Sequence, residues 1–358
     1  MMRTSPARPL SGSSHSLFRR LRTAFGSSAA LLWTGLAAVL LLIVACGVAW
    51  GRVAHEAHAQ PSASEPPADD ATGFMVQVDD HVVPHEIFSV FVMPGEALPL
   101  DVLLPGTPST FRARASKGVL RTQDGAAWTW TAPDAPGVYT LSITDTRDRD
   151  TLTLNAFVLH PFSHEQTHLN GYRIGRYKQG LYRNNPNYER PTGFIAVPDS
   201  ARDIRVSPHF RLEQFLCKQA SGSADPHVLL RERLLLKLEH ILRAVQDAGY
   251  SAETLHVMSG FRTPYYNRSI GNRTSYSRHL YGDAADIFVD ADGNGRMDDL
   301  DGDGRITRAD AVVLAHLIGD LTDEPWYEPL VGGLGIYGPA PHRGPFVHVD
   351  TRGTKARW

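Results

Sequence analysis

Residues 277–287 read SRHLYGDAADI, and residues 346–350, close to the end of the chain, read FVHVD. The first stretch places His279 and Asp286 seven residues apart around a glycine and two alanines, which let the backbone pass close to a bound ion. The second places His348 in a short strand-like run. Neutral imidazole and carboxylate are good zinc ligands, and a catalytic zinc has three protein ligands and one open position. Each stretch alone is a weak signal of a metal site.

Taken with their flanks, the two stretches resemble the LAS superfamily of zinc peptidases, which includes bacterial zinc D-Ala-D-Ala carboxypeptidases, VanY-type enzymes and murein endopeptidases. The superfamily pattern S-x-H-x-x-G-x-A-x-D is matched by residues 277–286, and a strand with a second histidine follows downstream. Upstream, residues 259–263 (SGFRT) are similar to the S-G-[YF]-R-[ST] turn of these enzymes. Residues 333–358 are similar to the end of small murein endopeptidases. The resemblance covers residues 207–358.

This resemblance implies an α+β zinc peptidase domain with a central antiparallel sheet, acting on peptidoglycan peptides. It implies that His279, Asp286 and His348 bind Zn²⁺, which activates a water molecule and polarises the scissile carbonyl. Arg262 is the candidate to hold a substrate carboxylate, since a guanidinium donates two parallel hydrogen bonds to that group. Ser277 is expected to bind the substrate or to order the loop.

The general base is where the sequence departs from the superfamily. Many members carry a glutamate three residues before the last ligand or a histidine two before it, but Pro345 and Phe346 stand at these positions. Asp350 lies two residues after the last ligand, so a strand would place both side chains on one face. We expect Asp350 to be either the base or a group that orients an imidazole, with His342 and Asp283 as lesser candidates. The alternative function is a catalytically inactive cell-wall-binding module that holds zinc and calcium.

An acidic insert, assigned to residues 290–331, follows the first stretch. Residues 299–310 (DLDGDGRITRAD) match an EF-hand calcium loop, in which short oxygen side chains alternate and a glycine makes the sharp turn. The expected calcium ligands are Asp299, Asp301, Asp303, Asp310 and, through its backbone carbonyl, Arg305. A second, overlapping loop is offered by Asp290, Asp292 and Asn294. The pattern predicts Ca²⁺ as a second cofactor.

Residues 73–161 are predicted to form an all-β, immunoglobulin-like sandwich. Seven short runs rich in Val, Thr, Leu and aromatic residues are separated by turn formers such as Pro94-Gly95 and Pro136-Gly137. Residues 162–206 are expected to be an irregular connector. In the last domain, helical spacing of apolar residues predicts helices over 228–248 and 309–318.

The N-terminal region sets the expected location. Residues 29–50 are free of charge and long enough to cross a bilayer as a helix, and the tail at 1–28 carries arginines and no acidic residue. We expect a single-pass signal anchor in the inner membrane, then a flexible linker at 51–72, with the soluble domains in the periplasm or outside the cytoplasm. The alternatives are a signal peptide cut before Gln60 and a lipoprotein modified at Cys46.

Composition excludes other classes of protein. The chain has 36 basic and 38 acidic side chains, so nothing in its overall charge suggests a nucleic-acid partner. It has two cysteines, Cys46 and Cys217, which is too few for a four-cysteine zinc site and leaves His, Asp and Glu as ligands. The expected fold class is therefore multidomain: a transmembrane helix, a β-sandwich, and a zinc peptidase domain with an EF-hand-like insert.

Overall fold

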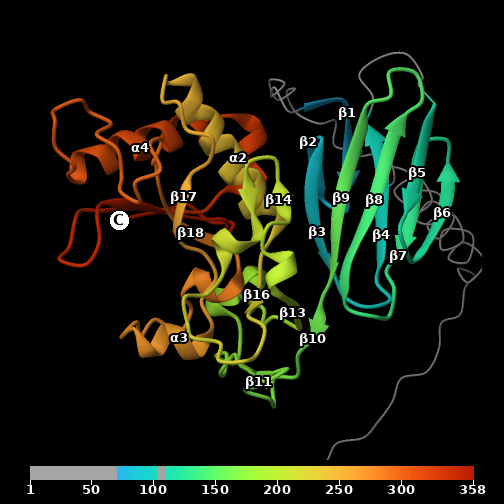
Figure 1. Ribbon diagram of the computed structural model, residues 1–358, viewed down its shortest axis with the longest axis horizontal. Helices are drawn as coiled ribbons and strands as arrows, with labels where there is room; N and C mark the ends of the chain where they lie inside the picture. Colours follow the sequence, from blue (N-terminus) through green and yellow to red (C-terminus); the bar gives the residue numbers. More distant parts are fainter. Residues whose placement is uncertain (1–70, 104–109) are drawn as a thin grey trace, which may run out of the picture. The chain divides into compact units, whose positions relative to one another are not determined.

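The computed structural model describes residues 71–103 and 110–358 (Figure 1). None of the helices in these ranges is both long and apolar enough to cross a bilayer. This finding corrects the predicted fold class and location: the transmembrane helix and the single-pass membrane placement are not supported. The segment at 29–50, on which both depended, lies outside the described residues. The described residues group into one compact unit, and the predicted domain boundaries within it stay predictions.

Nine strands between Ala71 and Val158 form two sheets, which stack as two layers (Figure 1). The first sheet has the order β2 (His81–His85), β1 (Ala71–Val78), β4 (Ala97–Leu103), β7 (Ala127–Thr131) and β6 (Val119–Asp124). The second has the order β3 (Ile87–Val92), β9 (Thr151–Val158), β8 (Gly137–Asp145) and β5 (Phe111–Ala115). Alternating side chains such as Trp128 and Trp130 point inward and are buried.

All seven strand runs predicted from the sequence are present, whereas β2 and β6 were missed. Strand β2 contains Pro84, and β6 reads VLRTQD, so neither shows the apolar pattern by which a strand is usually recognised. The two layers are joined by contacts such as that between Phe74 and Phe111, whose rings meet edge to face with centroids 5.0 Å apart.

Short elements connect these sheets to the C-terminal part. The paired strands are β10 (His160–Pro161) with β13 (Gly193–Ala196) and β16 (His227–Val228), β11 (His168–Leu169) with β12 (Tyr172–Arg173), and β14 (Arg205–Ser207) with β15 (Phe210–Arg211). The 3-10 turns between Tyr182 and Phe215 are η1 (Tyr182–Asn184), η2 (Pro186–Tyr188), η3 (Asp199–Ala201) and η4 (Leu212–Phe215). Much of the connector is therefore ordered by short local pairings.

A five-stranded sheet forms the centre of the C-terminal part, in the order β17 (His256–Ser259), β18 (Ala284–Phe288), β20 (Phe346–Asp350), β19 (Gly333–Tyr337) and β21 (Ala356–Arg357). Its pairs are antiparallel except that β21 runs parallel to β19. The predicted antiparallel sheet is thus a mixed one. The inner strands are β18, β20 and β19, and every residue of β18 and β20 is buried.

Helices α2 (Glu232–Asp247) and α4 (Arg308–Leu321) pack on each other, and α4 contacts β19 and β20. Helix α2 begins four residues later than predicted because residues 227–228 pair with β13 as a strand. The remaining helical elements are the short α-helix α3 (Pro264–Ser269) and the 3-10 helices η5 (Arg278–Tyr281) and η6 (Pro325–Leu330). The acidic insert follows strand β18 and not a helix, so the predicted EF-hand-like insert lacks the first helix of that motif.

Candidate metal centre

The register of the central sheet lines up one row of residues across four strands. Ser259 pairs with Asp286, Asp286 pairs with His348, and His348 pairs with Gly335. Directly opposite residues in a sheet project on the same face, so Asp286 and His348 lie side by side. His279 comes from η5, the turn immediately before β18. The fold thereby brings together three side chains that the sequence holds up to 69 residues apart.

The three side chains meet through specific atoms. His279 Nε2 lies 3.2 Å from Asp286 Oδ1, and His348 Nδ1 lies 2.9 Å from the same oxygen. Their candidate ligand atoms all lie within 4.8 Å of one another. All three residues are buried. This is the arrangement expected of a site with two imidazole ligands and one carboxylate ligand.

The partners behind each imidazole fix which nitrogen faces the cluster. His279 Nδ1 lies 2.7 Å from the Gly260 carbonyl, which can only accept, so Nδ1 carries the proton and Nε2 presents a lone pair. His348 Nε2 lies 3.0 Å from Asp350 Oδ2, and a proton held there leaves the lone pair of Nδ1 facing Asp286. Lone pairs from all three residues then converge, which a metal ion satisfies. The residues present therefore fit zinc.

The electrostatics of the cluster also favour a cation. Burial opposes protonation of His348, but hydrogen bonds to Asp286 and Asp350 outweigh it and raise the pKa of this imidazole to about 9. Burial lowers the pKa of His279, against the attraction of Asp286. Although burial opposes ionisation of Asp286, the two imidazoles hold the pKa of its carboxyl well below the usual range. Two carboxylates on opposite sides of His348 thus favour positive charge on this ring, and a metal ion bound at Nδ1 would replace the proton there.

Asp350 lies behind His348, away from the side that faces Asp286. It is fully buried, and its Oδ1 accepts hydrogen bonds from the backbone N–H of Gly333 at 2.9 Å and from Arg352 Nε at 2.8 Å. Its Oδ2 contacts both His348 Nε2 and the Arg352 guanidinium. Of the two roles expected for Asp350, this geometry matches the one that orients an imidazole.

Arg262 and Ser277 both line the same cavity as the three candidate ligands. Arg262 donates from Nη2 to Asp286 Oδ2 at 2.5 Å and from Nε to Ser259 Oγ at 2.8 Å. The guanidinium predicted to hold a substrate carboxylate therefore also holds the ligand carboxylate in place. Ser277 precedes η5, and its carbonyl accepts from the backbone N–H of Leu280.

The cavity has a volume of about 500 Å³. Among the described residues that line it, Asp286 is the only carboxylate. The lesser base candidates lie elsewhere: Asp283 is buried in an ion pair with Arg278, and His342 is exposed outside the cavity. The aromatic residues of the wall were not predicted from the sequence; they are Tyr276, Tyr337, Phe346 and Trp358. The G-x-G pattern of β19 could have indicated that a large side chain, here the Trp358 indole, packs against this strand.

The acidic insert forms two clusters: Asp290 with Asp292 and Asp298, and Asp299 with Asp301 and Asp303. Within each, carboxylates accept backbone N–H groups of their own loop, as Asp299 does from Gly304 at 2.6 Å. Of the other predicted ligands, Asn294 donates to Asp292 within the first loop, and Arg305 follows the second cluster.

Asp310, predicted as the last calcium ligand, belongs to neither cluster. It is fully buried and accepts from the backbone N–H groups of Leu300 at 2.8 Å and Thr307 at 2.7 Å, capping α4. No comparison supports calcium, and its binding stays a prediction.

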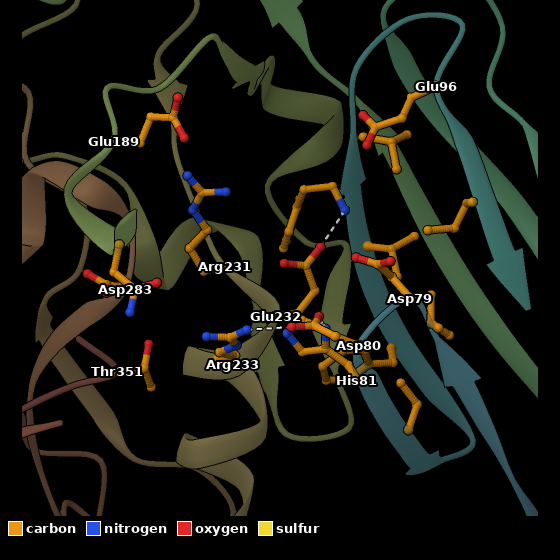
Figure 2. Close-up of a pocket in the computed structure, with 18 of the residues that line it drawn as sticks. Asp79, Asp80, His81, Glu96, Glu189, Arg231, Glu232, Arg233, Asp283 and Thr351 are labelled. Atoms are coloured by element: carbon orange, nitrogen blue, oxygen red, sulfur yellow. Dashed lines mark hydrogen bonds and ion pairs between the residues drawn. The ribbon is translucent and has the colours of Figure 1, made fainter. Parts of the chain in front are cut away.

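A second cavity, of about 400 Å³, lies between the first sheets and the start of α2 (Figure 2). Several of its charged side chains are engaged: Arg233 pairs with Asp80, as Figure 2 shows, and Arg278 pairs with Asp283. Glu232 accepts the backbone N–H of Phe91 at 2.9 Å. It contains none of the three candidate ligands, so we place the function in the cavity that does.

Comparison with known proteins points to the part of the chain that contains two of the candidate ligands. Residues 208–300 match the family model described as Peptidase M15. The matched segment contains Arg262, His279 and Asp286 and ends before His348. No curated protein matches the chain. Residues 208–300 are thus similar to the Peptidase M15 family, whose members depend on zinc, and this similarity supports a metallopeptidase.

Proposed function

We propose that this protein is a zinc-dependent peptidase that hydrolyses amide bonds in the stem peptides or cross-links of peptidoglycan. The observation that carries the proposal is the convergence of His279 Nε2, Asp286 Oδ1 and His348 Nδ1 at the wall of a cavity. The match of residues 208–300 to Peptidase M15 supports the reaction class. The substrate class rests on the resemblance of the C-terminal motifs to murein peptidases.

The residues around the ligands have separable tasks. When bound at the three ligand atoms, zinc supplies Lewis acidity toward a carbonyl oxygen and a water molecule. The Gly260 carbonyl and Asp350 hold the two imidazoles in the required tautomers. Arg262 holds Asp286 and lines the cavity, where a guanidinium can also meet a substrate carboxylate.

A second candidate function is a cell-wall-binding module that holds zinc without cleaving its ligand. It is favoured by one observation: among the described residues that line the cavity, no carboxylate side chain other than that of the candidate ligand Asp286 is placed to act as a general base. Both candidate functions require bound zinc, but only the peptidase cleaves its ligand.

Digestion of purified muropeptides by the zinc-loaded chain, read by mass spectrometry, tests the proposal. We expect loss of a terminal D-alanine or separation of cross-linked dimers, abolished by a chelator and restored by zinc. Loss of D-alanine identifies a carboxypeptidase, and separated dimers identify an endopeptidase. An unchanged digest from protein shown to contain zinc would contradict the peptidase and support the binding module.

A further inference from the structure

The indole of Trp358 lies beside the candidate metal ligands. Its ring centroid is 5.3 Å from that of His348, and it lines the same cavity. Trp358 is 49% exposed, which makes it one of the few large hydrophobic residues left open to solvent among those described. An exposed aromatic face next to a reactive centre is suited to contact with a ligand.

The position of this indole is fixed from several sides. Its Nε1 donates to the Tyr337 hydroxyl at 2.6 Å, and its backbone N–H and carbonyl bond to Leu334 and Ile336 of β19. Gly335, the residue opposite His348, lies against the ring: a Cβ added there would come within 2.5 Å of indole Nε1 and Cε2. A glycine is therefore required at this point by close approach. The ring is a preorganised surface and not a loose side chain.

Trp358 belongs to an aromatic wall. The rings of Tyr337 and Phe346, which also line the cavity, stack with centroids 4.5 Å apart at an angle of 5°. The polar lining is supplied by other residues, namely Asn272, Thr274 and Ser277. The aromatic wall can thus contact an aliphatic side chain of a ligand, while the polar residues can hydrogen-bond to its peptide groups.

The charges around the aromatic wall limit the kind of ligand side chain that can bind there. Arg262 and Arg352 line the cavity, and the guanidinium of Arg352 lies 5.4 Å from the Trp358 ring. The only described carboxylate in the lining, Asp286, is already engaged by two imidazoles and Arg262. The Arg352 guanidinium already takes the cation position beside the Trp358 ring. A further cation would meet the positive charge of the arginines, whereas an uncharged aliphatic side chain meets no such repulsion.

We propose that the indole of Trp358 is the substrate subsite that receives a small aliphatic side chain, such as an alanine methyl, of the residue next to the scissile bond. This inference rests on the proposed function, because it assigns specificity to the same cavity. Trp358 then contributes to substrate discrimination and leaves the affinity for zinc unchanged.

The placement of the indole can be tested without turnover. Co²⁺ added to the metal-free full chain is expected to quench tryptophan emission, since one of the six tryptophans adjoins the site. Trp358→Phe should bind Co²⁺ equally, by visible absorption, and lose most of the quenching. Trp326→Phe, which changes a tryptophan outside the cavity, is the control and should quench as the unmodified chain does. Equal quenching in Trp358→Phe would overturn the placement.

The subsite itself is tested on the zinc-loaded chain with two peptides that differ by one methyl group, diacetyl-L-Lys-D-Ala-D-Ala and diacetyl-L-Lys-D-Ala-Gly. We expect the unmodified chain to prefer the D-Ala-D-Ala peptide by about 10-fold in KM, the usual effect of one buried methyl group. Trp358→Ala should remove this preference with little change in kcat.

Gly335→Ala tests the same subsite without deleting the ring, because the added methyl displaces the indole. It should reproduce the loss of preference, and Trp326→Phe should not. Unchanged discrimination in both Trp358→Ala and Gly335→Ala, with zinc retained, would overturn the subsite. If the unmodified chain binds zinc but cleaves neither peptide, the peptidase proposal is contradicted while the subsite is not. The subsite is then tested in the same variants by measuring the affinities for the two peptides by calorimetry.

Discussion

At the scale of single residues, the centre depends on how His348 is held between two carboxylates. Asp286 faces its Nδ1 at 2.9 Å, and Asp350 faces its Nε2 at 3.0 Å. One carboxylate is placed to share a metal ion with the imidazole, and the other to hold the ring from behind. The two predictions at this scale separate these roles.

His348→Ala should abolish zinc binding and muropeptide cleavage together, because it removes one of three ligands from a buried site. Zinc content is measured by elemental analysis of the purified chain, alongside digestion. His342→Ala, a change at an exposed histidine outside the cavity, should leave both unchanged. One zinc per chain retained in His348→Ala would contradict the ligand assignment.

Asp350→Asn should weaken zinc affinity by about 10–100-fold, the usual effect of removing a carboxylate that orients a ligating imidazole. Affinity is measured by competition with a chromophoric chelator. Asp199→Asn, at an exposed site, is the matched control. If Asp350 were instead the general base, activity would fall while zinc affinity stayed the same.

The motif residues could be predicted from the sequence, but their immediate partners could not. His279, Asp286 and His348 stand in recognisable patterns, and the structure brings them together. The contact of Arg262 with Asp286 and the burial of Asp350 depend on strand register, which no local pattern encodes. The aromatic wall was missed because Tyr337, Phe346 and Trp358 become neighbours only when β19, β20 and β21 pair.

At the scale of elements, a buried lysine joins α2 to the central sheet. Lys237 Nζ donates to the carbonyls of Leu330 at 3.1 Å and Asp350 at 2.8 Å, at the ends of η6 and β20. Burial lowers the pKa of this amine to about 7, against the attraction of Asp350. Helical periodicity predicted α2, but its lysine would be expected on the solvent face.

Between about pH 7 and the ordinary lysine pKa of 10.5, the folded chain binds fewer protons at Lys237 than the unfolded chain does. The free energy of unfolding should therefore rise with pH through this window. Lys237→Met should remove that rise, an effect on the order of a few kcal/mol, seen in Tm measured from pH 6 to 10. Lys218→Met, at an exposed position, should keep the rise; an identical pH profile in Lys237→Met would contradict the buried amine.

The acidic clusters and the start of α4 allow a test of calcium. If Asp299, Asp301 and Asp303 hold Ca²⁺, its addition should raise the Tm of the chelator-treated chain, and Asp303→Asn should reduce this increase. Asp310→Ala should lower Tm by several degrees with or without Ca²⁺, because it removes the acceptor of buried backbone N–H groups. Magnesium is the control ion, and an unchanged Tm on adding Ca²⁺ would contradict calcium binding.

At the scale of the whole compact unit, contacts cross from the first sheets to the C-terminal part. The Glu232 carboxylate accepts the backbone N–H of Phe91, and Asn155 donates to the Arg205 carbonyl at 2.9 Å. The sequence predicted both regions, because each has its own periodicity, but it gave no sign of these contacts. They link residues that are 50 or more positions apart.

Glu232→Ala should lower the free energy of unfolding by about 1–3 kcal/mol, since it leaves the Phe91 N–H without its acceptor. Calorimetry of the full chain should show a lower Tm or a transition that broadens as the two regions uncouple. Glu253→Ala, at an exposed site, is the control. An unchanged transition in Glu232→Ala would show that the two regions unfold without this link.

The pairing of Asp286 with His348 joins residues 62 positions apart. A ribosome therefore completes two of the three candidate ligands well before it synthesises the third, and the acidic insert and α4 must emerge in between. The nascent chain cannot close this centre early. If the three side chains bind an ion, its stable uptake would then report that strand β20 has entered the sheet, late in the synthesis of the chain.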